Sequence, residues 1–206
     1  SDHGGSHINY AFRAGGDALI KNGTGTLTLS GVNTFTGQTV INGGVLQLLG
    51  GAAIADGNAI LVNAGGQLTV GANETIASIA GAGNVLLNTA SLTLGNASGT
   101  LTGAVSGTGT VIITAGTETF GGALTNSGGL QVNAGANAVV QSTGSVNVAA
   151  GAVQLGAAAT LTNAGLIAAS GGFGAYANGA NAVITNQASG DITGNVGVSG
   201  LVPFTV

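Results

Sequence analysis

Hydrophobic and polar residues alternate in short runs between Leu19 and Leu48, and glycines separate the runs. Alternation with a period of two is typical of β-strands that have one buried and one exposed face. Glycine suits the tight turns between such runs because it accepts positive φ angles at little steric cost. The pattern predicts four short strands, at residues 26–29, 33–36, 39–41 and 45–48.

Similar signals recur along the chain at intervals in the twenties. Asn42, Asn63 and Asn84, for example, are evenly spaced at such an interval. Short strands at such a period predict a solenoid, in which each coil buries its inward face against its neighbours. We therefore expect an all-β fold, a parallel β-helix of about nine coils. The alternative is an antiparallel β-sandwich, whose strands recur about every 8 to 12 residues without a longer repeat.

The polar residues of the repeats have a structural interpretation. Threonine favours strands and suits their exposed face, and the repeated asparagines are expected to stack as inward amide ladders between coils. Ice binding would require the same threonine pairs on many consecutive coils. The Thr-x-Thr pairs do not recur at one period, so this function is not expected.

No charged or proline-rich linker divides the chain, so residues 15–206 are expected to form a single β-helix segment. Residues 1–14 are expected to be an N-terminal tail, because they lack the basic and apolar regions of a signal peptide. The uncharged span 148–169 is long enough to cross a membrane. Its three glycines would weaken a helix, so no membrane insertion is expected.

The composition excludes several classes of protein. Only 4% of the residues are charged, two basic and six acidic, so there is no basic surface for nucleic acid. The chain has no cysteine, which excludes disulfides and thiolate metal sites. Aromatic residues make up 3% of the chain, which predicts a thin core without large rings.

No group of residues predicts nucleophilic catalysis or metal binding. His3 and His7 lie in the glycine-rich tail, and no serine lies in a Gly-x-Ser-x-Gly motif. The two histidines are four positions apart, but the glycines between them oppose the helix that would bring them together on a metal. We therefore expect no catalytic residue, no cofactor and no metal.

The ionisable groups are scattered. The cations Arg13 and Lys21 are both near the N-terminus, and the acids of the interior are far apart in the sequence: Asp56, Glu74, Glu118 and Asp191. We interpret these acids as isolated, solvated carboxylates that keep the rod soluble. The alternative function is a carbohydrate-active β-helix enzyme, in which stacking of coils would bring acids such as Asp56 and Glu74 together.

Residues 170–181 are the strongest candidate for a contact with a partner. They are rich in glycine and show no clear strand pattern, so we expect a loop. Phe173, Tyr176 and Asn178 are the candidate contact residues, because binding residues often lie on loops that a rigid scaffold presents. The alternative is that the two aromatic residues pack down and the loop is only a wide corner.

The segment from Gly23 to Leu46 resembles the passenger-associated repeat of Gram-negative autotransporters. Residues 107–132 resemble a degenerate second copy, and residues 163–195 are similar to the looser stem repeats of the same proteins. The resemblance implies a right-handed β-helical passenger segment that is exported, carried across the outer membrane by a C-terminal barrel outside this chain, and displayed on or released from the cell surface.

The function that this resemblance implies is structural and adhesive, and not catalytic. Its expected partners are a second copy of the chain, through self-association, or a ligand on a host or another surface. The resemblance also implies a role in virulence.

Overall fold

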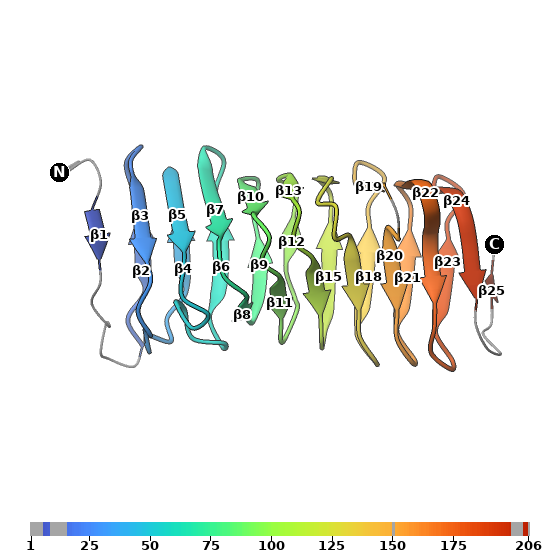
Figure 1. Cartoon of the computed structure of the whole chain (residues 1–206), viewed down its shortest axis with the longest axis horizontal. Helices are drawn as coiled ribbons and strands as arrows, with labels where there is room; N and C mark the ends of the chain where they lie inside the picture. Colours follow the sequence, from blue (N-terminus) through green and yellow to red (C-terminus); the bar gives the residue numbers. More distant parts are fainter. Residues whose placement is uncertain (1–5, 9–15, 150, 199–203, 206) are drawn as a thin grey trace.

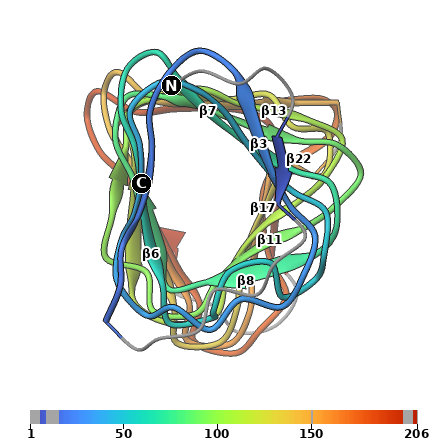
Figure 2. The ribbon, with the colours of Figure 1, turned by 90° about the vertical axis from the view of Figure 1, so that its left-hand side faces the viewer.

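The computed structural model describes residues 6–8, 16–149, 151–198 and 204–205. These residues form short parallel strands and no helix, and they stack as a β-solenoid of about eight turns. The turns lie side by side along the long axis, with the first and last described strands, β1 (Ser6–Ile8) and β25 (Phe204–Thr205), at opposite ends of the rod (Figure 1). The view along the axis shows that successive turns follow nearly the same outline (Figure 2). The predicted parallel β-helix is therefore confirmed.

The largest sheet of the described residues has two arms that meet in the long strand β22 (Leu166–Ala177). The first arm runs through β1 (Ser6–Ile8), β3 (Thr26–Leu29), β5 (Gly44–Leu48), β7 (Gly66–Val70), β10 (Asn84–Leu87), β13 (Val105–Gly107), β16 (Ala123–Leu124) and β19 (Ser145–Val148). The second arm runs through β8 (Glu74–Ile76), β11 (Leu92–Leu94), β14 (Val111–Ile113), β17 (Leu130–Val132) and β20 (Val153–Leu155). Strand β24 (Asp191–Val198) pairs with both halves of β22.

The third face of the solenoid consists of two sheets. The first contains β2 (Leu19–Lys21), β4 (Thr39–Ile41), β6 (Ala59–Val62) and β9 (Ser78–Ala80). The second contains β12 (Thr100–Leu101), β15 (Thr117–Phe120), β18 (Asn137–Val140), β21 (Thr160–Asn163), β23 (Val183–Asn186) and β25 (Phe204–Thr205). A single bridge between Gly81 and Leu101 joins the two sheets. From β6 to β24, each turn therefore contributes one strand to each of three faces.

Apolar side chains form continuous columns inside the solenoid. One column on the first arm consists of successive register partners: Leu27, Leu46, Leu68, Val85, Val105, Leu124, Val146, Ile167 and Ile192. Its members from Leu46 to Ile167 are at most 1% exposed. The step between partners is shortest from Leu68 to Val85 and longest from Ile167 to Ile192. The predicted period in the twenties is thus an average, and some turns are shorter.

Three of the four strands predicted between Leu19 and Leu48 are present, as β3, β4 and β5. The strand predicted at residues 33–36 is wrong, because no strand forms there. Side-chain hydrogen bonds hold this segment instead. The Asn33 amide donates to the carbonyl oxygens of Gly31, at 3.0 Å, and Ala53, at 2.7 Å. Such local side-chain bonds compete with the regular ladder of a sheet.

An asparagine ladder forms at one corner, but it is outside the core. Asn42 donates from its amide to Asn22 Oδ1, and Asn63 donates to Asn42 Oδ1, each at 2.7 Å. Asn22 and Asn42 are exposed, so the predicted inward position of this ladder is wrong. The corner turns the side chains outward, and the amides then bond along the rod axis. An inward pair does occur between the buried Asn163 and the half-buried Asn186, where the Asn163 amide donates to Asn186 Oδ1 at 2.8 Å.

None of the described residues forms a helix with the length and apolar character needed to cross a membrane. The uncharged span 148–169 contributes instead to four strands, β19 to β22. The predicted N-terminal tail, residues 1–14, is outside the described part of the chain apart from residues 6–8, whose backbone pairs with β3.

Candidate functional site

The segment predicted to be a loop is largely a strand. Residues 170–177 belong to β22, and only residues 178–181 of the predicted loop follow it. The loop prediction is therefore wrong for both aromatic residues. It failed because glycine is rare in strands, whereas here the glycines lie where β22 turns from the first arm to the second. Asn178 follows the strand, is exposed, and donates its backbone N–H to Leu155 O at 3.0 Å.

Phe173 and Tyr176 form an outward aromatic pair. The ring centroids are 5.1 Å apart and the ring planes are tilted by 34°. Phe173 is 40% exposed and Tyr176 is half-buried. The other aromatic side chains that the structure describes, Phe35 and Phe120, are at most 2% exposed. Neither ring of the pair therefore lies in the core, and the two rings pack against each other.

An irregularity in β22 places the two rings on the same face. In a regular strand, residues three positions apart point to opposite faces. The pairing of β22 with β24 shifts register between Phe173 and Ala175, and Gly174 and Ala175 are both buried. A bulge of this kind re-aims side chains, so Phe173 and Tyr176 both face outward.

Tyr176 continues an outward column of glutamines on the second arm. Gln131 of β17 pairs with Gln154 of β20, and Gln154 pairs with Tyr176. Each lies at the centre of an apolar-polar-apolar triplet whose flanking side chains are buried. Neither glutamine was predicted from the sequence as part of a site. The sequence signal that could have identified them is this shared triplet, which recurs at nearly the same interval as the turns.

Two of the carboxylates predicted to be solvated are buried. Glu74 is 2% exposed, and its two oxygens accept the backbone N–H groups of Ala53, at 3.1 Å, and Ile54, at 2.9 Å. Burial raises the pKa of Glu74 to about 7, although the backbone hydrogen bonds lower it. The nearby charge of Asp56 adds a smaller increase to this pKa. Stacking thus brings these two acids near each other. Asp56 is exposed, however, and both oxygens of Glu74 accept hydrogen bonds from the backbone.

Glu118 is also buried, with no exposed surface. Its Oε2 accepts the backbone N–H of Gly99 at 3.1 Å. Burial raises the pKa of Glu118 to about 8, and hydrogen bonds from the backbone oppose this increase. Alternation within the strands places Glu74 on the same face as the buried Ile76, and Glu118 on the same face as the buried Phe120. The interpretation of both glutamates as solvated carboxylates is therefore wrong.

The one lysine that the structure describes is buried and hydrogen-bonded to the backbone. Lys21 is 7% exposed, and its Nζ donates to three carbonyl oxygens, those of Asn22, Gly23 and Gly43, at 2.9 to 3.1 Å. Among the described residues, no three histidine or acidic side chains are grouped so that they could hold a metal ion. Arg13 and His3 are outside the described residues, and only the backbone of His7 is placed.

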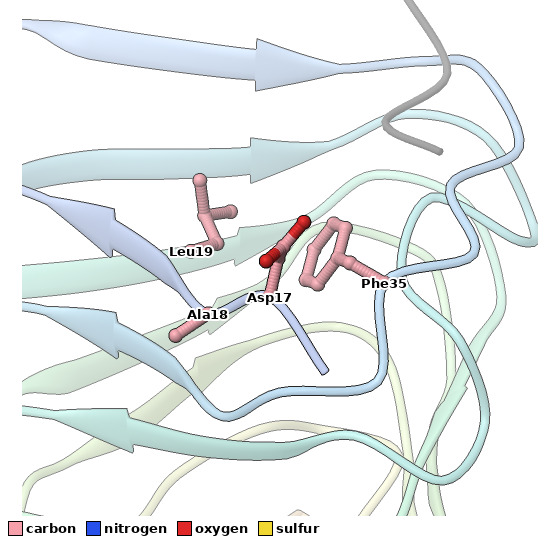
Figure 3. A pocket seen from close by; sticks show the side chains of 4 residues that line it. All are labelled: Asp17, Ala18, Leu19 and Phe35. Atoms are coloured by element: carbon pink, nitrogen blue, oxygen red, sulfur yellow. The ribbon is translucent and has the colours of Figure 1, made fainter. Parts of the chain in front are cut away.

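A small hollow lies near the N-terminal end of the described rod. Asp17, Ala18, Leu19 and Phe35 line it, and its volume is about 40 Å³ (Figure 3). The Asp17 carboxylate lies beside the Phe35 ring in this view. Ligand pockets have volumes of roughly 300 to 1,000 Å³. The hollow has room for a few water molecules but not for a sugar or a cofactor.

Comparisons with known proteins point to one family. Residues 19–48 match the passenger-associated transport repeat. The chain is 37% identical over 94 residues to the adhesin BmaC autotransporter of Brucella suis biovar 1 (strain 1330). This match covers 42% of the chain but only 3% of that much longer protein. No solved structure matches the chain significantly. The resemblance to autotransporter passengers is confirmed, and the chain carries a passenger-associated transport repeat on a parallel β-helix.

Proposed function

We propose that this chain is a structural and adhesive passenger segment of an autotransporter, displayed on or released from the cell surface, without catalytic activity. One observation carries the proposal: the matched repeat, residues 19–48, forms neighbouring turns near one end of the described β-helix. A relative named an adhesin, similar over 94 residues, supports the adhesive role. The name of that relative describes it as an adhesin, and we extend this role to the present chain.

The first arm of the large sheet suits self-association through polar contacts. Its outward residues include Thr26, Asn147 and Thr193, which are exposed. Asp191 is the only charged side chain among the described side chains of this arm, so repulsion between copies is weak. Sheet surfaces that must stay apart usually carry more charge. Many displayed copies would add up weak contacts through avidity.

Surface display and adhesion are tested by fusing the chain between an export signal and an outer-membrane barrel in a Gram-negative host. We expect cells that display the chain to be labelled by an antibody without permeabilisation, and to clump or bind surfaces more than cells with the barrel alone. Labelling without any gain in clumping or binding would contradict the adhesive role. Release of sugars from polysaccharide by the purified chain would contradict the non-catalytic role.

Self-association is tested by a triple aspartate variant of the first arm, Thr26→Asp, Asn147→Asp and Thr193→Asp. The matched control adds the same charge at exposed corner residues, with Ala64→Asp, Ala134→Asp and Ser142→Asp. We expect the arm variant alone to lower the sedimentation coefficient at high concentration and to reduce clumping. A chain that is monomeric at high concentration, or equal effects of both variants, would contradict self-association through this arm.

A further inference from the structure

The second arm carries an uncharged strip of aromatic and amide side chains, hereafter the ring–amide strip. It consists of Gln131, Gln154, Tyr176, Phe173 and Asn178. The first three are successive register partners in one outward column. Phe173 precedes Tyr176 within β22, and Asn178 directly follows the end of this strand. Gln131, Gln154, Phe173 and Asn178 are exposed.

The rings of this strip are not needed to fill the core. Alanines occupy the interior on both sides of Tyr176, since Ala175 and Ala177 are fully buried. On the C-terminal side, the register partner of Tyr176 is Gly197, which has no side chain to cover the ring. The bulge at Phe173 brings the second ring to the same face, at 5.1 Å from the first. The fold thus places the two rings next to each other, with Phe173 exposed and Tyr176 half-buried.

The amides of the strip retain hydrogen-bonding capacity. Gln154 and Asn178 make no side-chain hydrogen bond within the described part of the chain. Gln131 uses its Nε2 in a bond to Asn133 Oδ1 at 3.0 Å, and its Oε1 stays available. An amide offers both donors and acceptors, as a sugar hydroxyl does. The apolar face of a sugar ring can in turn stack on an aromatic ring.

The charge and spacing of the strip restrict the ligand further. No residue of the strip is ionisable apart from the Tyr176 phenol, so nothing in it compensates the charge of an acidic sugar. Parallel strands lie about 4.8 Å apart, which is close to the length of one sugar unit in an extended chain. A chain that follows the rod axis therefore meets one side chain of the Gln131–Gln154–Tyr176 column per sugar.

We propose that the ring–amide strip binds an uncharged, extended oligosaccharide that lies along the rod axis over β17, β20 and β22. The sugar faces stack on Phe173 and Tyr176, and the hydroxyls bond to Gln154, Gln131 and Asn178. The strip lies on an outward sheet face, so the affinity of one strip is low and many displayed copies act together. This inference rests on the proposed adhesive function and names its ligand class.

The test is calorimetric titration of the purified chain with three probes: cellohexaose, which is extended and neutral, maltohexaose, which is curved and neutral, and hexagalacturonate, which is acidic. We expect binding of cellohexaose in preference to the other two. Tyr176→Ala should weaken it about tenfold, and Gln154→Ala should weaken it several-fold. Tyr176→Phe keeps the ring and should keep the binding. Val32→Ala, which shortens an exposed apolar side chain on another part of the rod, is the control.

Each variant is first checked for an unchanged melting temperature. Absence of cellohexaose binding at millimolar concentration, or equal binding by wild type and Tyr176→Ala, would overturn the inference. So would a loss of self-association, rather than of sugar binding, in Tyr176→Ala, because the strip would then bind a second copy. If displayed cells adhere but the purified chain binds no probe, this inference fails and the proposed function stands. If the chain binds cellohexaose but displayed cells do not adhere, the proposed function fails instead.

Discussion

Asn33 and Glu74 hold the same peptide segment from neighbouring turns of the solenoid. Asn33 donates its amide to Ala53 O at 2.7 Å, and Glu74 accepts the N–H groups of Ala53 and Ile54 at 3.1 and 2.9 Å. The three turns involved are thus joined by side chains at a place where no strand forms between residues 33 and 36. This arrangement requires a buried carboxyl group, and it makes the stability of the rod depend on pH.

The first prediction is that the folded chain becomes less stable as the pH rises. The pKa values of Glu74 and Glu118 are raised from 4.5 to about 7 and about 8. The folded state therefore binds more protons than the unfolded state between these values. The stabilisation is fully present below about pH 4.5. It is lost as the pH rises through about 7 for Glu74 and about 8 for Glu118, by roughly 3 kcal/mol and roughly 5 kcal/mol, respectively. Urea unfolding at pH 5 and pH 8 measures the change.

The Glu118→Gln variant isolates one of the two groups. Its amide cannot ionise, so we expect higher stability than wild type at pH 8 and a flatter pH dependence. Asp56→Asn, at an exposed acid, is the matched control and should leave most of the dependence in place. A wild-type stability that increases from pH 5 to pH 8 would contradict the raised pKa values.

The second prediction concerns the outward asparagine ladder. Asn42→Ala removes both the bond to Asn22 and the bond from Asn63, and should cost about 1 to 3 kcal/mol of unfolding free energy. Asn96 is exposed and makes no side-chain hydrogen bond within the described residues, so Asn96→Ala should stay within about 0.5 kcal/mol. Equal midpoints in urea for the two variants would show that the ladder does not stabilise the corner.

The third prediction separates two reasons for glycine in the rod, which are a positive φ angle and a lack of space for a Cβ atom. Gly57 has open space and no positive φ, and Gly65 has open space and a φ of 90°. Gly107 has a φ of 105°, and Leu87 O occupies the space that a Cβ would need. Gly57→Ala should be neutral, and Gly65→Ala should cost about 1 to 2 kcal/mol. Gly107→Ala should cost more than Gly65→Ala, because the neighbouring coil must also move. Thermal melts rank the three, and any other order would contradict this explanation.

The fourth prediction concerns the interior columns. Leu46 is fully buried between Leu27 and Leu68, so Leu46→Ala should cost about 2 to 5 kcal/mol. Val32 is 62% exposed, and Val32→Ala should change the unfolding free energy by about 0.5 kcal/mol or less. Denaturant unfolding of both variants gives the comparison, and similar losses would be inconsistent with a solenoid core.

The sequence alone determined the architecture of this protein. Alternation in runs such as residues 26–29 and 45–48, with glycine turns between them, predicted short strands with one buried face. The interval in the twenties predicted that these strands stack in parallel, because a single coil cannot bury its inner face alone. The repeat between Leu19 and Leu48 was also recognisable as a passenger-associated repeat, since its signal is local in the sequence.

Only the tertiary structure decided which polar residues point inward and which outward residues are neighbours. Glu74 and Glu118 were interpreted as solvated acids, but the stacked turns bury both and supply backbone N–H groups to their carboxyl oxygens. Phe173 and Tyr176 are close in the sequence, yet only the bulge in β22 brings both rings outward. Gln131, Gln154 and Tyr176 became one column because turns of unequal length still align by their backbone hydrogen bonds. Hydrogen-bond register between distant segments is a property of the folded chain, and a single sequence does not encode it locally.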